Sequence, residues 1–182
     1  HIDKTQYLYE LIDRGKVYFM SRPRRFGKSL TISTLYYLFK GERELFKDTW
    51  IYDKIEWEAH PVIKLSMSET ENYNESVLRE SLYENLQEVY CSHGFEPDSK
   101  LLKIAFKRLI KRLYDKYGKR VVVLIDEYDK PILNHLHEPE KAAKIREILL
   151  SFYSTLKDSD PYLEFVMLTG ITKLTKLGVF ST

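Results

Sequence analysis

Residues 21–30, SRPRRFGKSL, contain side chains of the types that bind phosphate. Gly27 allows the backbone to approach a phosphate closely, Lys28 can reach its outer oxygens, and the Ser29 hydroxyl can help to bind Mg²⁺. Arg22 stands where the pattern G-x-x-x-x-G-K-[ST] has its first glycine. Two interpretations are therefore open, a nucleotide-binding loop and a solvated basic turn.

A second candidate set follows the apolar run VVVLI at 121–125. Asp126 can hold the hydration shell of Mg²⁺, and Glu127 can orient a water molecule for attack on a γ-phosphate. The alternative is that the acids of DEYDKP cap a helix or a turn, which we expect for Asp129. The loop and the acid pair complement each other. The loop supplies a lysine and a backbone that can bind phosphate, while the acids can bind the metal ion and orient the water.

Thr169 follows a third apolar run, EFVML at 164–168. A hydroxyl at this point could hydrogen-bond the γ-phosphate or the attacking water, although the adjacent Gly170 is equally typical of a plain turn. We therefore predict catalytic roles for Lys28, Glu127 and Thr169, and a Mg²⁺ site at Ser29 and Asp126.

The elements that must position these residues alternate between strands and helices. Apolar β-prone runs predict strands at 16–20, 61–67, 121–125 and 164–168, and apolar residues at helical spacing predict helices at about 30–39, 74–91, 98–117 and 138–156. VVVLI shows no polar alternation, which indicates a parallel strand buried on both faces by helices. An α/β fold follows, and open α/β sheets bind ligands at the carboxyl ends of their strands.

Specific apolar positions are expected to face the core. Leu101 belongs to the predicted inward face of the 98–117 helix. We interpret a group of aromatic residues as core and helix packing, not as a platform for adenine: Tyr36, Tyr37, Phe39, Phe46 and Trp50.

Composition narrows the class of protein. A chain of 182 residues, 43% hydrophobic and 14% aromatic, fits one folded domain. The net charge of +2 gives no strong overall attraction to nucleic acid or anionic membrane. The single Cys91 excludes an internal disulfide and favours a cytoplasmic setting, and no apolar run reaches the ~20 residues of a membrane span. The missing initial Met and the ending LGVFST indicate a fragment.

Four segments together resemble the bacterial and archaeal AAA-ATPase-like family. They are DKTQYLYELI, YFMSRPRRFGKSLTISTL, VVVLIDEYDKPI and MLTGITKLTKLGVFS, which occur in the family's order and cover nearly the whole chain. The first glycine of the loop is replaced in the same way in that family, so the resemblance removes Arg22 as an objection to a nucleotide site. The loop is then expected to bind ATP through Arg22, Pro23, Arg24, Arg25, Phe26, Gly27, Lys28, Ser29 and Leu30.

The resemblance implies further properties. The fold would be a three-layer P-loop NTPase with a parallel sheet of the additional-strand type, in which the fourth strand lies between the first and third. Asp3, Lys4 and Thr5 would lie near the base of the nucleotide. Residues 1–182 would form one C-terminally truncated domain, with the last strand, the lid and often a PD-(D/E)xK nuclease-like domain further along. The implied function is a Mg²⁺-dependent ATPase with slow turnover or a regulatory switch.

Two further functions remain open at this point. One is nucleotide binding without hydrolysis. The other is nucleic-acid binding through the basic segment 103–120, which we otherwise interpret as a solvated helix surface. This segment contains one acidic residue, Asp115, and eight basic residues: Lys103, Lys107, Arg108, Lys111, Arg112, Lys116, Lys119 and Arg120. His135 and His137 have only the distant Cys91 as a further soft ligand, so we do not predict a metal site there.

Overall fold

The molecule is built on a sheet of four parallel strands. The computed structural model describes residues 3–14, 16–21 and 28–172. The strands are β1 (Val17–Ser21), β2 (Val62–Ser66), β3 (Val121–Asp126) and β4 (Leu163–Gly170), in the order β1-β4-β3-β2. The predicted α/β class is confirmed, as is the expectation that the fourth strand lies between the first and third.

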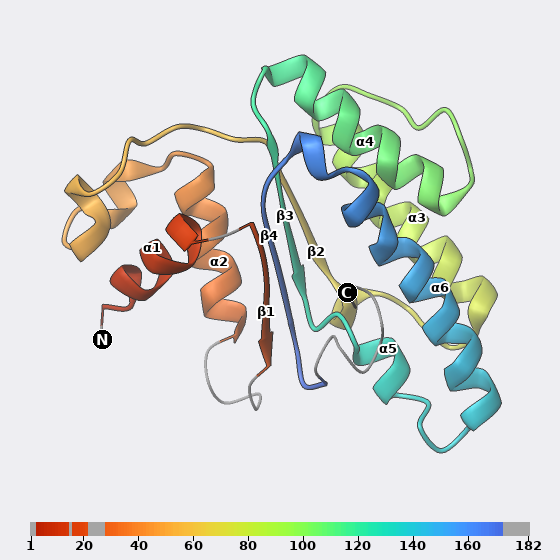
Figure 1. Cartoon of the computed structure of the whole chain (residues 1–182). Coiled ribbons are helices and arrows are strands. Elements are labelled where there is room, and N and C mark those ends of the chain that lie inside the picture. The colour runs from red at the N-terminus through yellow and green to blue at the C-terminus, as the bar shows by residue number, and fades with distance from the viewer. Residues whose placement is uncertain (1–2, 15, 22–27, 173–182) are drawn as a thin grey trace.

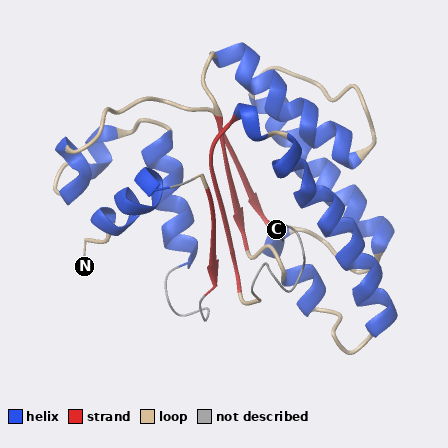
Figure 2. Ribbon diagram, in the orientation of Figure 1, coloured by secondary structure: helices blue, strands red, loops and turns tan. Residues whose placement is uncertain are grey.

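Helices cover both faces of this sheet. One layer contains α1 (Thr5–Arg14), α2 (Lys28–Phe39) and the short 3₁₀ helices η1 (Arg43–Phe46) and η2 (Trp50–Asp53), and the opposite layer contains α3 (Glu75–Ser92), α4 (Leu102–Tyr117) and α6 (Pro139–Asp158) (Figures 1 and 2). The shorter elements are η3 (Met67–Glu69), α5 (Lys130–Leu133) and η4 (Asp160–Tyr162). The chain therefore forms three layers with the sheet in the middle.

Strand β3 joins the two hydrophobic cores. Val121, Val123 and Ile125 pack with α3, α4 and α6, whereas Val122 and Leu124 pack with α1 and α2. All five side chains are completely buried. The uninterrupted apolar run predicted this double burial, because a strand covered on both faces needs no polar alternation.

Local signals explain where the helices begin and end. The Asn74 side chain accepts a hydrogen bond of 2.9 Å from the Val77 N–H and caps the start of α3. Gly118, at φ 65°, ends α4 in a left-handed conformation that glycine adopts without steric penalty. The 98–117 helix begins at Leu102, later than predicted, and α1 and α5 were not predicted.

The predicted core positions were partly wrong. Leu101 is 65% exposed because it precedes the first turn of α4 and does not lie on its inner face. Phe39 and Phe46 are buried, as predicted, but Tyr37 is 46% exposed and meets Tyr36 edge-on. Tyr36 and Trp50 are partly buried against the α1–α2 core. In the described ranges, no helix combines the length and the apolar character that a membrane span requires.

Candidate functional site

The carboxyl ends of all four strands meet at one edge of the sheet. Ser21 of β1 pairs with Gly170 of β4, and Ser66 of β2 pairs with Asp126 of β3. Strands β3 and β4 pair up to Ile125 and Leu168, so Asp126 and Thr169 come next on neighbouring strands. We call this end of the sheet the carboxyl edge.

A strand precedes and a helix follows the predicted phosphate loop, as expected. β1 ends at Ser21, and α2 begins at Lys28 on the same side of the molecule as the carboxyl edge (Figure 1). The N-terminus of a helix carries partial positive charge and unpaired N–H groups, which suit an anion. The predicted loop residues Arg22, Pro23, Arg24, Arg25, Phe26 and Gly27 lie outside the described residues, as do the side chains of Lys28 and Ser29.

Thr169 connects the two predicted acids at the carboxyl edge. Its hydroxyl donates a hydrogen bond of 2.6 Å to Asp126 Oδ1 and accepts one of 3.2 Å from the backbone N–H of Glu127. Thr169 is completely buried, while Asp126 and Glu127 are half-buried. The structure therefore brings the Thr169 hydroxyl into contact with two adjacent acidic residues that precede it by more than forty positions in sequence.

Glu127 has an unusual backbone conformation. Its φ of 52° is the one positive value at a non-glycine residue in the described chain. The left-handed region costs an ordinary residue about 1 kcal/mol or more, and such strain gathers at functional sites. Neighbouring bonds hold this turn in place, since the N–H of Tyr128 donates to Thr169 O over 2.8 Å and the N–H of Lys130 donates to Glu127 O over 3.0 Å.

Asp129 takes part in this edge in a way that the sequence did not predict. We expected it to cap a turn, and it stands at the N-cap position of α5, but its side chain does not bond the helix. Its Oδ2 instead accepts backbone N–H bonds from Ile171, at 3.0 Å, and Thr172, at 2.6 Å. Asp129 is only 2% exposed, and the segment that follows β4 supplies these two hydrogen bonds to its buried carboxylate.

Two tyrosines surround Asp129. The Tyr128 hydroxyl donates to Thr172 O, and the Tyr153 hydroxyl, from α6, donates to Tyr128 O. Burial, followed by the nearby Asp129 carboxylate, raises the pKa of both hydroxyls, so both remain neutral donors at physiological pH. The turn after β3 is thereby tied to β4 and to α6.

Asp3 and Thr5 form a separate cluster at the start of α1. Asp3 accepts from the Thr5 N–H and hydroxyl and, over 2.6 Å, from the Trp50 N–H, while the Thr5 hydroxyl accepts from the Ile51 N–H. Chiefly the Thr5 N–H, and then that of Trp50, lowers the pKa of Asp3. These contacts join α1 to η2, and Lys4 beside them is exposed. A place near the nucleotide base stays a prediction for all three residues.

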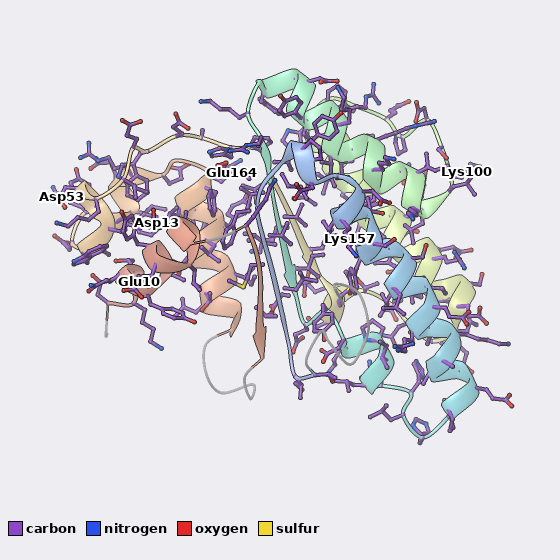
Figure 3. All side chains as sticks on the ribbon, viewed as in Figure 1. Glu10, Asp13, Asp53, Lys100, Lys157 and Glu164 are labelled. Atoms are coloured by element: carbon purple, nitrogen blue, oxygen red, sulfur yellow. The ribbon has the colours of Figure 1, made fainter. Side chains whose placement is uncertain are left out.

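Most basic residues of the segment 103–120 already have partners at the surface of the protein. Five of its basic residues pair with carboxylates: Lys103 with Asp158, Arg108 with Asp98, Lys111 with Asp115, Lys119 with Glu58 and Arg120 with Glu164. Arg112 and Lys116 donate to backbone carbonyls. Glu164 lies at the end of the sheet opposite the carboxyl edge (Figure 3). This pattern favours a solvated surface with internally balanced charge over a nucleic-acid face.

Two other possible sites lie away from the carboxyl edge. His135 is buried and contacts Asn72 O at 2.7 Å, and no group of three or more metal-ligating side chains occurs among the described residues. A cavity of about 240 Å³ opens between α3, α6 and the start of α4. Its lining mixes acids and bases, including Glu75, Lys103 and Lys144, and contains none of the predicted site residues.

Comparisons with known proteins agree with the chain's own motifs. A family model described as Predicted AAA-ATPase matches residues 1–180. An uncharacterized protein in the vnfD 5' region of Azotobacter chroococcum mcd 1 is 40% identical over 182 residues. The match covers 100% of this chain but 35% of that relative, so the chain spans about a third of its length. No solved structure matches the chain.

Proposed function

We propose that this chain, which belongs to the predicted AAA-ATPase family, is a P-loop module that binds Mg²⁺-ATP at the carboxyl edge of its sheet. In the intact protein it would act as a slow ATPase or a regulatory switch. The observation that carries the proposal is the contact of Asp126, Glu127 and Thr169 at the edge where β1 ends and α2 begins. This arrangement supports a common site for a phosphate-binding helix start and a pair of acids.

Each residue has a distinct proposed role. The loop residues 22–30 surround the phosphates, and Lys28 contacts their outer oxygens as a point charge. Glu127 orients the attacking water, and Thr169 holds Asp126 in place while its hydroxyl lies close to the reacting phosphate. Asp3, Lys4 and Thr5 would contact the base.

The donor set fits a magnesium ion. Mg²⁺ prefers oxygen ligands and is usually held by one or two carboxylates or hydroxyls together with substrate phosphates. Asp126 supplies a half-buried carboxylate oriented by Thr169, and Ser29 supplies a hydroxyl at the start of α2. When bound, the ion would neutralise charge that develops on the phosphate oxygens.

Hydrolysis in the intact protein is part of the proposal. An arginine supplied by a lid or a partner can raise turnover ~10³-fold or more in related chemistries, and we propose that such a group lies outside these 182 residues. The relative's greater length is consistent with additional regions, among which we propose a nuclease-like domain. Binding without hydrolysis is the alternative that the experiment below separates.

Titration with ATP and GTP, each with and without Mg²⁺, tests the proposal. We expect ATP binding that needs Mg²⁺ and that weakens at least ~10-fold in Lys28→Ala, because the point charge on the phosphates is lost. Glu127→Gln should keep its ATP affinity within about twofold while single-turnover phosphate release falls ~10²-fold or more.

Lys107→Ala is the matched control, because Lys107 is an exposed lysine of α4 in the opposite layer. It should bind ATP like the unmodified chain. Equal ATP affinity in the Lys28→Ala and unmodified proteins would contradict the proposed site. Tight binding with no phosphate release from any form would leave the non-hydrolysing alternative as the function.

A further inference from the structure

Beyond their last ladder pair, β3 and β4 are held together by a small group of partly buried contacts. The strands pair in register up to Ile125 and Leu168, after which the chain turns at Glu127. From there, Tyr128 and Asp129 bond to Thr169, Ile171 and Thr172. We call Tyr128, Asp129, Gly170, Ile171 and Thr172 the strand-exit latch.

Gly170 shows how closely the two exits approach each other. A Cβ at this position would lie 2.5 Å from two atoms of the Tyr128 ring and 2.7 Å from Asp129 Oδ1. Real Cβ atoms do not come this close to heavy atoms, so the packing requires glycine here. In the sequence, Gly170 was equally typical of a plain turn. In the structure, it allows the close packing of the two strand exits.

The chemistry of Asp129 suits a fixed position. One carboxylate oxygen accepts two N–H groups from consecutive residues, and the other lies against Gly170. Hydrogen bonds to an ionised acceptor are roughly twice as strong as bonds between neutral groups. An asparagine has the same shape but a weaker acceptor, so it would loosen the latch without emptying the space.

The contacts of Asp129 lie next to Thr169 in the chain. This residue must donate to Asp126 and accept from Glu127 at the same time, which fixes its hydroxyl relative to both acids. Asp129 holds the chain two and three residues further on, at Ile171 and Thr172. Thr169 itself pairs with Met20 in the β1–β4 ladder, so Asp129 anchors the chain just beyond the ladder in which Thr169 lies.

We infer that Asp129 is a positioning residue for ATP turnover: by anchoring Ile171 and Thr172 it keeps the Thr169 hydroxyl aligned with Asp126 and Glu127. Asp129 acts through Thr169 and does not itself contact the nucleotide. This inference rests on the proposed function, whose chemical step it refines.

The experiment measures kcat and KM for ATP in the intact protein that contains this chain, unmodified and with Asp129→Asn. We expect kcat to fall about 10-fold or more with KM changed less than about twofold, because alignment and not binding is lost. Amide hydrogen exchange at Ile171 and Thr172 should become faster in the variant. Asp98→Asn, an exposed aspartate paired with Arg108, is the matched control and should leave all three quantities unchanged.

A double-mutant cycle separates positioning from general loosening. Thr169→Val removes the hydroxyl that Asp129 is inferred to align, so adding Asp129→Asn to Thr169→Val should lower kcat little further. If Asp129→Asn does not fold, Tyr128→Phe provides a milder change, since it removes the hydroxyl bond to Thr172 O and keeps the aromatic ring. This variant should lower kcat in the same direction by a smaller factor.

Each outcome bears on a different claim. Normal turnover in the unmodified protein with an unchanged kcat in Asp129→Asn overturns the inference and leaves the proposed function intact. Independent, multiplying effects of Asp129→Asn and Thr169→Val also overturn it, because Asp129 would then act by another route. An unmodified protein that fails to bind ATP overturns the proposed function, and with it the role of Asp129.

Discussion

The carboxyl edge of the sheet and the basic surface of α4 differ in how they use polar residues. At the carboxyl edge, Thr169 and Asp129 are buried and bond to groups more than forty positions away in sequence. In the segment 103–120, five of the eight basic residues form ion pairs at the surface, as Lys111 does with Asp115 one helical turn away. Long-range pairs occur in both regions, as between Lys103 and Asp158, so burial of the polar groups is what distinguishes the carboxyl edge.

This difference shows which polar residues point to function. An exposed ion pair contributes little because water and salt screen it, and it can be changed without disturbing the fold. A buried polar group must be satisfied, so its partners fix the relative position of the elements that carry them. Residues such as Thr169 therefore define a site in a way that the eight basic residues of 103–120 do not.

The largest stability effect should come from a methyl group at the carboxyl edge. Gly170→Ala places a Cβ against the Tyr128 ring and Asp129, and we expect it to lower the free energy of unfolding by about 3 kcal/mol, the upper end for overpacking. Gly118→Ala is the matched change, because that glycine has no neighbour near its Cβ and only its φ of 65° opposes alanine. It should lower the free energy of unfolding by about 1 kcal/mol.

Denaturant unfolding of both variants measures this contrast, and phosphate release adds a second readout. Gly170→Ala should also slow ATP turnover, whereas Gly118→Ala should not, since Gly118 ends α4 away from the carboxyl edge. Equal losses of stability in the two variants would show that the strand exits can move apart, which contradicts the close packing at Gly170.

Much of the layered fold could be predicted because its signals are local. Consecutive valines at 121–123 indicate a strand buried on both faces, and the left-handed glycine at 118 marks a helix end. The strand order came from the family resemblance and not from periodicity, because nothing local states which parallel strands are neighbours. Leu101 was expected to face the core because its spacing fits the predicted helix 98–117. The helix in fact begins at Leu102, so Leu101 precedes it and is exposed.

The site could be predicted as residues but not as a network. Position after a buried strand indicated Asp126, Glu127 and Thr169, and the bond between Asp126 and Thr169 brings these strand ends together. Asp129 looked like a turn cap because DKP is a typical turn sequence, while its actual donors lie 42 and 43 residues away. Pairings at this separation depend on strand order and register, which a single sequence does not encode locally.

Asp3 sharpens the comparison because it combines exposure with long-range backbone bonds. Its pKa is lowered by N–H donors from Thr5 and Trp50, so its contribution to stability is present above the unfolded-state pKa of about 3.8 and is lost as pH falls through the lower folded-state pKa. Asp3→Asn should therefore lower Tm at pH 7, and the difference from the unmodified protein should shrink as pH falls below about 4.

Thermal unfolding between pH 7 and pH 2 tests this dependence. Asp53→Asn removes a negative charge from an exposed position in the same layer, where the partner is Lys54 at 4.0 Å. At pH 7 it should change Tm less than Asp3→Asn does. A Tm difference for Asp3→Asn that stays constant down to pH 2 would contradict a contribution from the ionised carboxylate.

The smallest effect is expected on the basic surface of α4. Replacing Lys107, Lys111 and Arg112 together by alanine removes one exposed ion pair and a guanidinium that lies over the Phe95 ring at 4.5 Å. Exposed pairs contribute little in water, so Tm should change by only about 2 °C, and ATP affinity should stay within about twofold of the unmodified value. Salt-dependent binding to a DNA duplex serves as the second measurement, because a true nucleic-acid face would lose affinity uniformly across sequences when these charges are removed. If the unmodified protein binds DNA and the triple variant does not, charge pairing on α4 would not have excluded function, and burial alone would be too strict a guide to the sites of this molecule.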